Sequence, residues 1–440
     1  MRRTTIALLV GVVTLVGSVR SPANESGALV PPGFVVTPYA EAGGAVTSLD
    51  VGPDTRAGSS GSRLYATSFT GGEVLVFDDV GGAATPPTTF ASGFQSPLGV
   101  LAAPDGTVYV SDAEPSRPGP FGERPYGRVW RVRDVNQDGD ALDEEDTKHI
   151  VLKDLPNGRH NTNGLALGPD GMLYVTNGNS TDDGIEGGEP EAHPWSGSVV
   201  RINPATTEVS VTDLDPNQAL VARGMRNLYD LAFSPFDPTK LFITTNGVDD
   251  ARKNDTPPPD HLEDSDDLLY LSDIDNGGPA ARKAGPKKGK ARVGSNDITE
   301  DFGFPSCLYN LERRGDLEPY DNPHPDVIAQ FGACNKQSIV RPIASFGLHP
   351  SADGVALQTT GAWGDDFLND MFVAEFGNFS GEEVVGHKVV RVEFDASGEK
   401  VAAQSDFLEG VLPLDVTFDA SGEMLVADFS GTILRVTKAI

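Results

Sequence analysis

The chain has 440 residues, with 34 Lys and Arg against 64 Asp and Glu, and a formal net charge of −30 at pH 7. This acidic balance argues against nucleic-acid binding, because phosphate recognition needs a basic face. The 50 Gly and 33 Pro, with few long helical patterns, favour many short strands joined by turns.

The chain begins like an exported protein. Arg2 and Arg3 precede a short apolar run that ends at small residues, which is typical of a secretory signal peptide. The run is shorter than the ~20 residues of a membrane-spanning helix, and Arg20 and Pro22 end it. We therefore expect a signal peptide at residues 1–23, no transmembrane segment after its removal, and a secreted or periplasmic protein.

A strand pattern recurs from residue 33 onwards. A lone strand is expected at residues 34–40, and each of the units that follow holds about three short apolar runs separated by turns. The phrases Pro-Asp-Gly and Gly-x-Val-x-Arg-Val recur among the units. The six units begin near Val46, Pro97, Leu165, Leu228, Gly354 and Leu414.

These units are not predicted to be separate domains. A small sheet with two apolar faces is not stable alone, whereas six such sheets packed radially bury one another's faces. The prediction is an all-β fold, a six-bladed β-propeller over residues 33–440, in which the strand at residues 34–40 completes the last blade. A β-sandwich array is the alternative, but it would not explain the recurring phrases.

Two insertions interrupt the units, at residues 134–155 and 276–342. We expect both on one rim of the propeller, where loops carry function. Cys307 and Cys334 lie in the second insertion, and such a pair in an exported protein is expected to form a disulfide. Closing a loop of about 27 residues would stabilise the fold by ~3 to 4 kcal/mol in the loop-entropy model. The basic run at residues 282–292 is interpreted as a solvated loop.

Residues 134–145 satisfy the calcium-loop pattern D-x-[DN]-x-[DN]-G-x5-E in full. Calcium takes about 6 to 8 oxygen ligands in a flexible shell, and the Gly supplies the sharp turn. No amphipathic helix flanks the loop, so a paired EF-hand sensor is not expected. A structural calcium is preferred over an acidic solvated loop. The candidate ligands are Asp134, Asn136, Asp138, Asp140 and Glu145.

Three residues stand in loops that lead into the inner strands of units three and four. His160 precedes unit three, and Arg226 and Asn227 precede unit four, so all three are expected at the mouth of the central channel. A neutral imidazole there could act as a general base, and a guanidinium could hold a carboxylate or similar anion. The alternative is that Arg226 and Asn227 only hold neighbouring blades together. His349 has a comparable position before unit five, and the acidic loop at residues 246–262 could place a cation nearby or be solvated.

Five motifs occur along the chain: VWRVRDVNQDGDALDEED, HNTNGLALGPDGMLYVTNGN, GMRNLYDLAFSP, NGVDDARKNDTPPPDHL and DFGFPSC. Together they resemble the glucose/sorbosone dehydrogenase family, and the similarity covers residues 33–436. The resemblance implies a soluble six-bladed propeller that uses pyrroloquinoline quinone (PQQ), with calcium, to oxidise a small-molecule sugar or alcohol. It also implies that His160 is the general base and that Arg226 and Asn227 contact the quinone.

Two positions depart from that family. Where its members often carry His-Gly-Ser-Trp-Asn-Arg, residues 376–381 read FGNFSG, and Leu412 stands where an Arg commonly precedes the Pro of the last blade. Two cationic contacts to a tricarboxylate cofactor are therefore missing, and Lys388 is a candidate to replace one. A charge-assisted hydrogen bond contributes ~1.5 to 3 kcal/mol, so the loss of two would weaken quinone binding by roughly a hundredfold or more.

The sequence leaves three functions open. The first is an exported quinone-dependent dehydrogenase that acts on a sugar or a related alcohol or aldehyde. The second is a non-catalytic propeller that binds a glycan or a protein ligand, which the missing Arg residues favour. The third is a calcium-dependent lactonase-type hydrolase, which would need several carboxylate or Asn ligands converging in the channel.

Overall fold

The computed structural model describes residues 27–78, 86–186, 189–190, 194–248, 265–274, 299–378 and 384–439. The expected signal peptide, most of the acidic loop at residues 246–262 and the basic run at residues 282–292 lie outside the described residues. No helix in the described part of the chain is long and apolar enough to cross a membrane.

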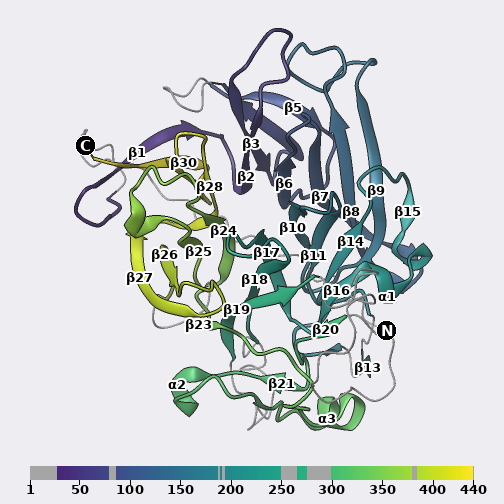
Figure 1. Cartoon of the computed structure of the whole chain (residues 1–440). Coiled ribbons are helices and arrows are strands. Elements are labelled where there is room, and N and C mark those ends of the chain that lie inside the picture. The colour runs from purple at the N-terminus through teal and green to yellow at the C-terminus, as the bar shows by residue number, and fades with distance from the viewer. Residues whose placement is uncertain are drawn as a thin grey trace, which may run out of the picture.

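Six sheets of four or five strands surround a central axis, and each sheet is one blade (Figure 1). The first three blades follow one another along the chain. Blade 1 consists of β2 (Val46–Pro53), β3 (Ser62–Ser68), β4 (Glu73–Phe77) and β5 (Thr88–Ser92); blade 2 of β6 (Gly99–Ala102), β7 (Val108–Gly119), β8 (Gly122–Arg133), β9 (Thr147–Pro156) and β15 (Val209–Ser210); blade 3 of β10 (Thr162–Leu167), β11 (Leu173–Asn177), β14 (Ser198–Ile202), β16 (Leu220–Arg223) and β20 (Glu300–Asp301).

The other three blades complete the ring, which is the predicted six-bladed β-propeller. Blade 4 consists of β17 (Asn227–Phe233), β18 (Lys240–Asn246), β19 (Asp266–Asp273) and β23 (Ala344–Leu348); blade 5 of β24 (Ala352–Leu357), β25 (Met371–Glu375), β26 (Lys388–Phe394) and β27 (Val401–Glu409); blade 6 of β28 (Pro413–Phe418), β29 (Met424–Asp428), β30 (Thr432–Lys438) and β1 (Phe34–Glu41).

Short elements lie in the connections between these strands. They are β12 (Ile185–Glu186), β13 (Glu189–Pro190), the 3-10 helix η1 (Val211–Asp213), α1 (Pro216–Ala219), β21 (Cys307–Leu308), α2 (Leu311–Arg314), β22 (Tyr320–Asp321), α3 (Pro325–Phe331) and the 3-10 helix η3 (Asp365–Phe367).

The core lies between the faces of neighbouring blades. On β11 of blade 3, Leu173 and Val175 belong to a buried cluster with Val151 of blade 2, whereas Tyr174 belongs to the cluster that contains Leu231 of blade 4. Successive side chains of a strand point to opposite faces, so an apolar run of this kind is buried on both sides. This explains why the run from Leu173 to Val175 is apolar without alternation.

The N-terminal strand closes the ring, as predicted. β1 pairs antiparallel with β30, with Phe34 opposite Lys438. The ring of Phe34 also lies edge-on to Trp363 and Phe407 of blade 5, at centroid distances of 4.9 and 5.0 Å. The first strand is therefore held by hydrogen bonds to blade 6 and by aromatic packing against blade 5.

Aspartates on the inner strands connect neighbouring blades. The Asp415 carboxylate of blade 6 accepts the Leu49 N–H of blade 1 at 2.7 Å, and the Asp230 carboxylate of blade 4 accepts the Val355 N–H of blade 5 at 2.9 Å. A Cβ on Gly164 of blade 3 would lie 2.4 Å from Asp230 Oδ1. Glycine is required there, because any side chain would collide with the carboxylate.

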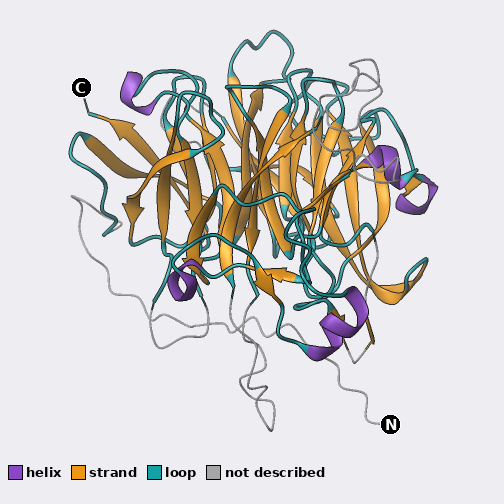
Figure 2. Cartoon of the chain, turned by 60° about the horizontal axis from the view of Figure 1, so that its bottom comes forward, coloured by secondary structure: helices purple, strands orange, loops and turns teal. Residues whose placement is uncertain are grey.

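The described part of the second insertion at residues 302–342 lies at the opposite end of the strands from the first insertion, which corrects the expectation that both insertions lie on one rim. The loop after β8 packs against the β2–β3 turn, where Thr55 Oγ1 donates to the Asp134 carboxylate at 2.6 Å. The segment after β20 is at the other end, where the Phe302 N–H donates to the Arg223 carbonyl at 2.9 Å. β19, which leads into the second insertion, runs in the same sense as β8, so both insertions start at the same end of the strands. β20 pairs parallel with β16 and carries the chain to the other of the two ends seen in Figure 2.

Candidate functional site

The candidate site lies at the end of the channel where the inner strands begin. His160 stands in the loop between β9 and β10, and Arg226 and Asn227 stand where β16 leads into β17. Asn179, in the loop after β11, donates its N–H to the Arg226 carbonyl at 2.5 Å. The structure therefore brings the three predicted residues of blades 3 and 4 to one mouth.

The ring of His160 is fixed by the backbone. Its Nδ1 lies 2.6 Å from the Asn179 carbonyl oxygen, and because a carbonyl only accepts, Nδ1 carries the proton and Nε2 keeps a lone pair. Burial, followed by the positive charge of Arg226, lowers the pKa of His160 to about 3. A Cβ on Gly178 would lie 2.6 Å from the His160 Cβ, so glycine permits this close approach. The imidazole is therefore neutral at neutral pH, as a general base must be.

Arg226 is buried and paired with Asp182 of the loop after β11. Its Nε lies 3.0 Å from the Asp182 carbonyl and 3.1 Å from Asp182 Oδ1, and its Nη2 donates to the same oxygen. Burial is the largest influence on the pKa of Asp182 and raises it, but the charge and hydrogen bond of Arg226, with smaller effects of His160 and Arg159, together outweigh burial and leave that pKa lowered. The ionised carboxylate therefore fixes the guanidinium beside His160.

Asn227 belongs to a network of side chains that joins blades 3, 4 and 5. Its Nδ2 donates to Asn246 Oδ1 at 2.8 Å, and its Oδ1 accepts from Asn163 Nδ2 at 3.3 Å. Asn246 Nδ2 in turn lies 3.2 Å from Asp353 Oδ1. Asn227 therefore takes part in connecting the three blades.

Buried carboxyl groups form the blade 4 and blade 5 side of the mouth. The Asp267 carboxylate accepts the Gly247 N–H at 2.6 Å and the Ala352 N–H at 3.1 Å. Burial raises its pKa to about 6, although Arg226 and His349 lower it in part. Burial likewise raises the pKa of Glu375 to about 8. The mouth thus combines paired cations with carboxyl groups that are partly protonated near neutral pH.

Lys388 stands at the edge of these carboxyl groups. Its Nζ lies 2.6 Å from Asp406 Oδ1 and 3.7 Å from Glu375 Oε2. Burial lowers the pKa of Lys388, but the two carboxyl groups more than offset burial, and the net shift is upward. Lys388 is therefore a charged donor with partners of its own.

Asp182, Asp267 and Glu375 were not indicated by the sequence pattern. Asp267 is the second residue of β19, just before its apolar run, and Glu375 ends the otherwise apolar β25, and this placement is a signal that could have pointed to these two residues. Their partners lie on other blades, which a single-strand pattern does not show.

The calcium-type loop is at the opposite end of the molecule. Asp134 accepts the N–H groups of Gln137 at 2.6 Å and Gly139 at 3.0 Å, as the first residue of such a loop does. The chain closes through Asp146, whose carboxylate accepts the Val135 N–H at 2.8 Å, while Glu145 is exposed.

The acidic side chains in the middle of this loop approach one another. Asn136 Nδ2 lies 3.1 Å from both Asp138 Oδ2 and Asp143 Oδ2. The hydrogen bond and negative charge of Asp138 raise the pKa of Asp143. The Asp140 carboxylate accepts the Leu142 N–H at 3.1 Å. Over the described residues, no group of three or more His, Cys, Asp or Glu side chains converges as a metal site would.

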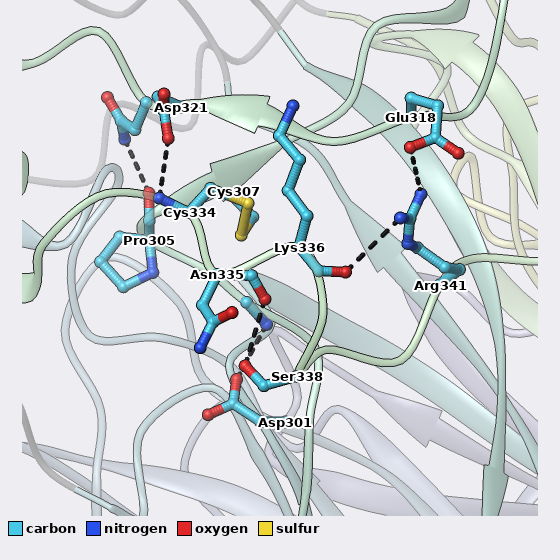
Figure 3. The surroundings of a disulfide bond; sticks show 12 residues. Asp301, Pro305, Cys307, Glu318, Asp321, Cys334, Asn335, Lys336, Ser338 and Arg341 are labelled. Carbon is cyan, nitrogen blue, oxygen red and sulfur yellow. Dashed lines mark hydrogen bonds and ion pairs between the residues drawn. A yellow bond between two sulfur atoms is a disulfide. The ribbon is translucent and has the colours of Figure 1, made fainter. Parts of the chain in front are cut away.

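The expected disulfide between Cys307 and Cys334 is formed (Figure 3). The Cys334 N–H donates to Asp321 Oδ1 at 2.8 Å beside it. The same segment reaches the candidate site, because the Phe304 N–H donates to the Gly224 carbonyl at 2.8 Å, two residues before Arg226. The disulfide-bearing insertion therefore supports the strand end that presents Arg226.

The fold and the mouth define a six-bladed propeller with a neutral histidine beside a buried arginine. Solved structures with this fold include the calcium structure of the carbohydrate-active enzyme of family AA12 from Trichoderma reesei, with 15% identity, a TM-score of 0.67 and coverage of 93% of this chain and 97% of that one. The holo form of the pyranose dehydrogenase PQQ domain from Coprinopsis cinerea has 14% identity, a TM-score of 0.67 and coverage of 94% and 98%. The apo form of the soluble aldose sugar dehydrogenase from Escherichia coli has 14% identity, a TM-score of 0.59 and coverage of 92% and 99%.

The family follows from the sequence. The model of the TrAA12-like family matches residues 133–412, more than half of the chain. The chain belongs to the TrAA12-like family. No curated protein matches it.

Proposed function

We propose that the protein is an exported dehydrogenase that oxidises a sugar, or a related alcohol or aldehyde, with a quinone of the PQQ type as electron acceptor. The observation that carries this proposal is the neutral imidazole of His160, held by Asn179 and placed beside Arg226. Membership of the TrAA12-like family and the shared fold of the C. cinerea PQQ domain support it. The disulfide is in keeping with export.

His160 and Arg226 have separate roles in the reaction. Oxidation of an alcohol removes a proton from the hydroxyl oxygen and a hydride from the carbon that bears it. The Nε2 of His160 takes the proton, while Nδ1–H keeps its bond to the Asn179 carbonyl and stabilises the imidazolium that forms. Arg226 orients an oxygen of the bound ligands. A bound quinone supplies the two-electron acceptor that the hydride requires.

The pKa of His160 depends on what lies next to Arg226. The guanidinium charge contributes to the low value of about 3, and negative charge bound there would offset it. An anionic ligand at Arg226 is therefore expected to raise the basicity of His160 towards the working pH, which is where a general base is most effective.

The residues at the mouth fit a planar quinone that carries carboxylates. Arg226 and Lys388 supply charged donors, and Asn227 supplies an amide. Glu375, with its pKa near 8, is mostly protonated at neutral pH and repels an anion only weakly, and burial also raises the pKa of Asp353. Leu412 contributes no cation, so the affinity is expected to be lower than with a full set of arginines.

A calcium in the loop that starts at Asp134 is the second part of the proposal. Asp134, Asn136, Asp138 and Asp140 would supply oxygens, and the loop-closing Asp146 fits better than the exposed Glu145. The unfavourable approach of Asp138 to Asp143 is the observation that supports a cation there. Because the loop is at the far end from His160, this calcium would stabilise the fold and take no part in oxidation.

A non-catalytic propeller that binds a glycan or a protein is the second candidate. It is favoured by the pairing of Arg226 with Asp182 and of Lys388 with Asp406, which leaves fewer charged donors for a tricarboxylate. A calcium-dependent hydrolase has no such support, since the described residues hold no converging set of acidic or histidine ligands.

Calorimetric titration of the calcium-loaded mature protein with PQQ separates the two candidates. We expect binding that weakens by roughly tenfold to a hundredfold in Arg226→Ala, since a charge-assisted contact is lost. His160→Gln should bind PQQ like the wild type but lose dye-linked sugar oxidation by about 10²- to 10⁴-fold. An absence of PQQ binding would exclude the quinone-dependent dehydrogenase and favour the propeller that binds a glycan or a protein.

A further inference from the structure

A groove of ≈ 560 Å³ lies at the same end of the molecule as the candidate site, between blades 5 and 6. Its walls come from the end of β1, the connection between β27 and β28, the turn between β29 and β30, and His387 just before β26. Its volume falls in the range of about 300 to 1,000 Å³ that is usual for small-molecule sites. His160, Arg226, Asn227 and Lys388 do not line it, whereas Leu412, which stands where the resemblance expects a cationic quinone contact, forms part of one wall.

One wall of the groove presents two carboxylates and two hydroxyls. Thr432 Oγ1 donates to Glu41 Oε1 at 3.1 Å. Asp428 accepts the Leu412 N–H at 2.7 Å and the Ser430 N–H at 2.9 Å. These bonds orient the carboxylates, and each carboxylate oxygen has capacity for a further hydrogen bond from a ligand.

The rest of the lining is apolar. Pro38, Val411, Leu412 and Leu434 contribute carbon atoms beside the polar wall. A site with an apolar surface on one side and oriented acceptors on the other suits a ligand that has C–H faces and hydroxyl edges. Saturated sugar rings have this character.

The charge of the lining limits the ligand further. The only side chains in it that ionise as acids or bases are those of Glu41, Asp428 and His387, and no Lys or Arg is among them. An anionic ligand would therefore be repelled. These three side chains are not arranged as a metal site within the described residues. The lining therefore favours an uncharged ligand that carries many hydroxyl groups.

The groove is connected to the candidate site through the chain. The N–H groups of Gly410 and Val411 donate to the His387 carbonyl at 3.0 and 3.3 Å, and Lys388 is the next residue. His387 has a φ of 57°, a conformation that non-glycine residues rarely adopt, and a Cβ on Gly377 would lie 2.4 Å from its ring. The ring is therefore held against the backbone that follows β25, between the groove and Lys388.

We propose that this groove binds a further sugar unit, so that the protein takes an oligosaccharide or the end of a polysaccharide chain. The proposal rests on the proposed function only in assuming that the sugar unit to be oxidised lies at His160. Binding of a second sugar unit in the groove does not require oxidation. Glu41 and Asp428 accept hydroxyl hydrogen bonds, and Ser430 and Thr432 complete the polar wall.

Binding without the quinone tests this proposal separately from the oxidation. Mono-, di-, tri- and tetrasaccharides of the gluco-, manno-, galacto- and xylo- series are titrated into the wild-type protein, into Ser430→Trp, which fills the groove, and into Glu123→Gln on the distant β7–β8 hairpin as control. The ring signals of His387, identified by their loss in His387→Gln, report the place of binding by NMR.

In at least one series, affinity should rise about tenfold or more from the mono- to the trisaccharide, with a shift of the His387 signals. Ser430→Trp should abolish this gain and leave monosaccharide binding and oxidation unchanged, and Glu123→Gln should behave like the wild type. Affinity that does not depend on chain length in any series, or a gain that survives in Ser430→Trp, overturns the subsite. Failure of PQQ binding alone would count against the dehydrogenase and not against the groove.

Discussion

The phenol of Tyr229 crosses the central channel and donates to the Thr47 carbonyl at 3.3 Å. Tyr229 is on β17 of blade 4 and Thr47 on β2 of blade 1, which face each other across the ring (Figure 1). Beyond Tyr229, a cavity of ≈ 420 Å³ is lined by all six inner strands, with Asp50, Asp230 and Asp415 in its wall. Tyr229 therefore links opposite blades across the channel.

Substitution of Tyr229 tests whether its ring fills the channel. Tyr229→Phe loses one hydrogen bond and should reduce the free energy of unfolding by about 0.5 to 1.5 kcal/mol. Tyr229→Ala also leaves a cavity and should reduce it by about 3 to 5 kcal/mol. Urea unfolding of both variants measures the difference. If Tyr229→Ala is no less stable than Tyr229→Phe, the ring does not pack in the channel.

Stability should fall as the pH rises from 5 to 8. Burial raises the pKa of Asp50 and Asp230 to about 7 and of Glu375 to about 8. A carboxyl group whose folded pKa is raised contributes stability that is fully present below its unfolded pKa of about 4 and is lost as the pH passes its folded pKa. Asp182 has a lowered pKa and titrates below this window. Thermal unfolding at several pH values checks the trend.

Asp230→Asn is the matched variant for that experiment. It keeps the shape of the side chain and an acceptor for the Val355 N–H, but it has no charge to bury. The decline of the melting temperature between pH 5 and 8 should therefore be shallower than in the wild type. An identical slope would mean that Asp230 does not contribute to it.

Removal of calcium should lower the melting temperature if the loop after β8 binds the ion. The carboxylates of Asp138 and Asp143 approach each other there, and without a cation their repulsion is not balanced. Calorimetry with and without chelator measures the shift, and Asp134→Asn with Asp138→Asn should abolish it. A melting temperature that does not respond to the chelator in the wild type would exclude this loop as a calcium site.

Loss of the disulfide should destabilise the insertion and, with it, the candidate site. Cys307 and Cys334 are 27 residues apart, and the loop-entropy model gives about 3 to 4 kcal/mol for a loop of that size. The double variant Cys307→Ser with Cys334→Ser should melt earlier and bind ligands of Arg226 more weakly, because Phe304 holds Gly224 in place. If the melting temperature falls but ligand binding is unchanged, the disulfide stabilises the fold without supporting the candidate site.

Local sequence patterns were sufficient to predict the fold. The apolar run around Tyr174 and its neighbour from Ser198 to Ile202 are strands because their residues suit a surface that is buried on both faces. The count of strands also predicted that the first strand completes the last blade. The expectation of one rim for both insertions was wrong for residues 302–342, because β20 returns along β16 to the other end of the strands and no local pattern indicates that pairing.

The candidate site could be predicted only in part. His160 and Arg226 stand at the start of inner strands, so the propeller alone places them at the mouth. Asp182 is 44 residues from Arg226, and Asp267 is 85 residues from the Ala352 N–H that it accepts. Such partners are set by how the blades pack, and no local pattern contains them.

The pairing of Phe34 with Lys438 joins the first strand of the propeller to its last. During synthesis β1 emerges before every other strand, and it must wait for β30 as an unpaired edge, which is a surface prone to wrong pairing. The aromatic contacts of Phe34 with Trp363 and Phe407 also come late in the chain. Ring closure therefore requires synthesis through β30, because a product that terminates earlier would keep an unpaired edge that proteases and chaperones recognise.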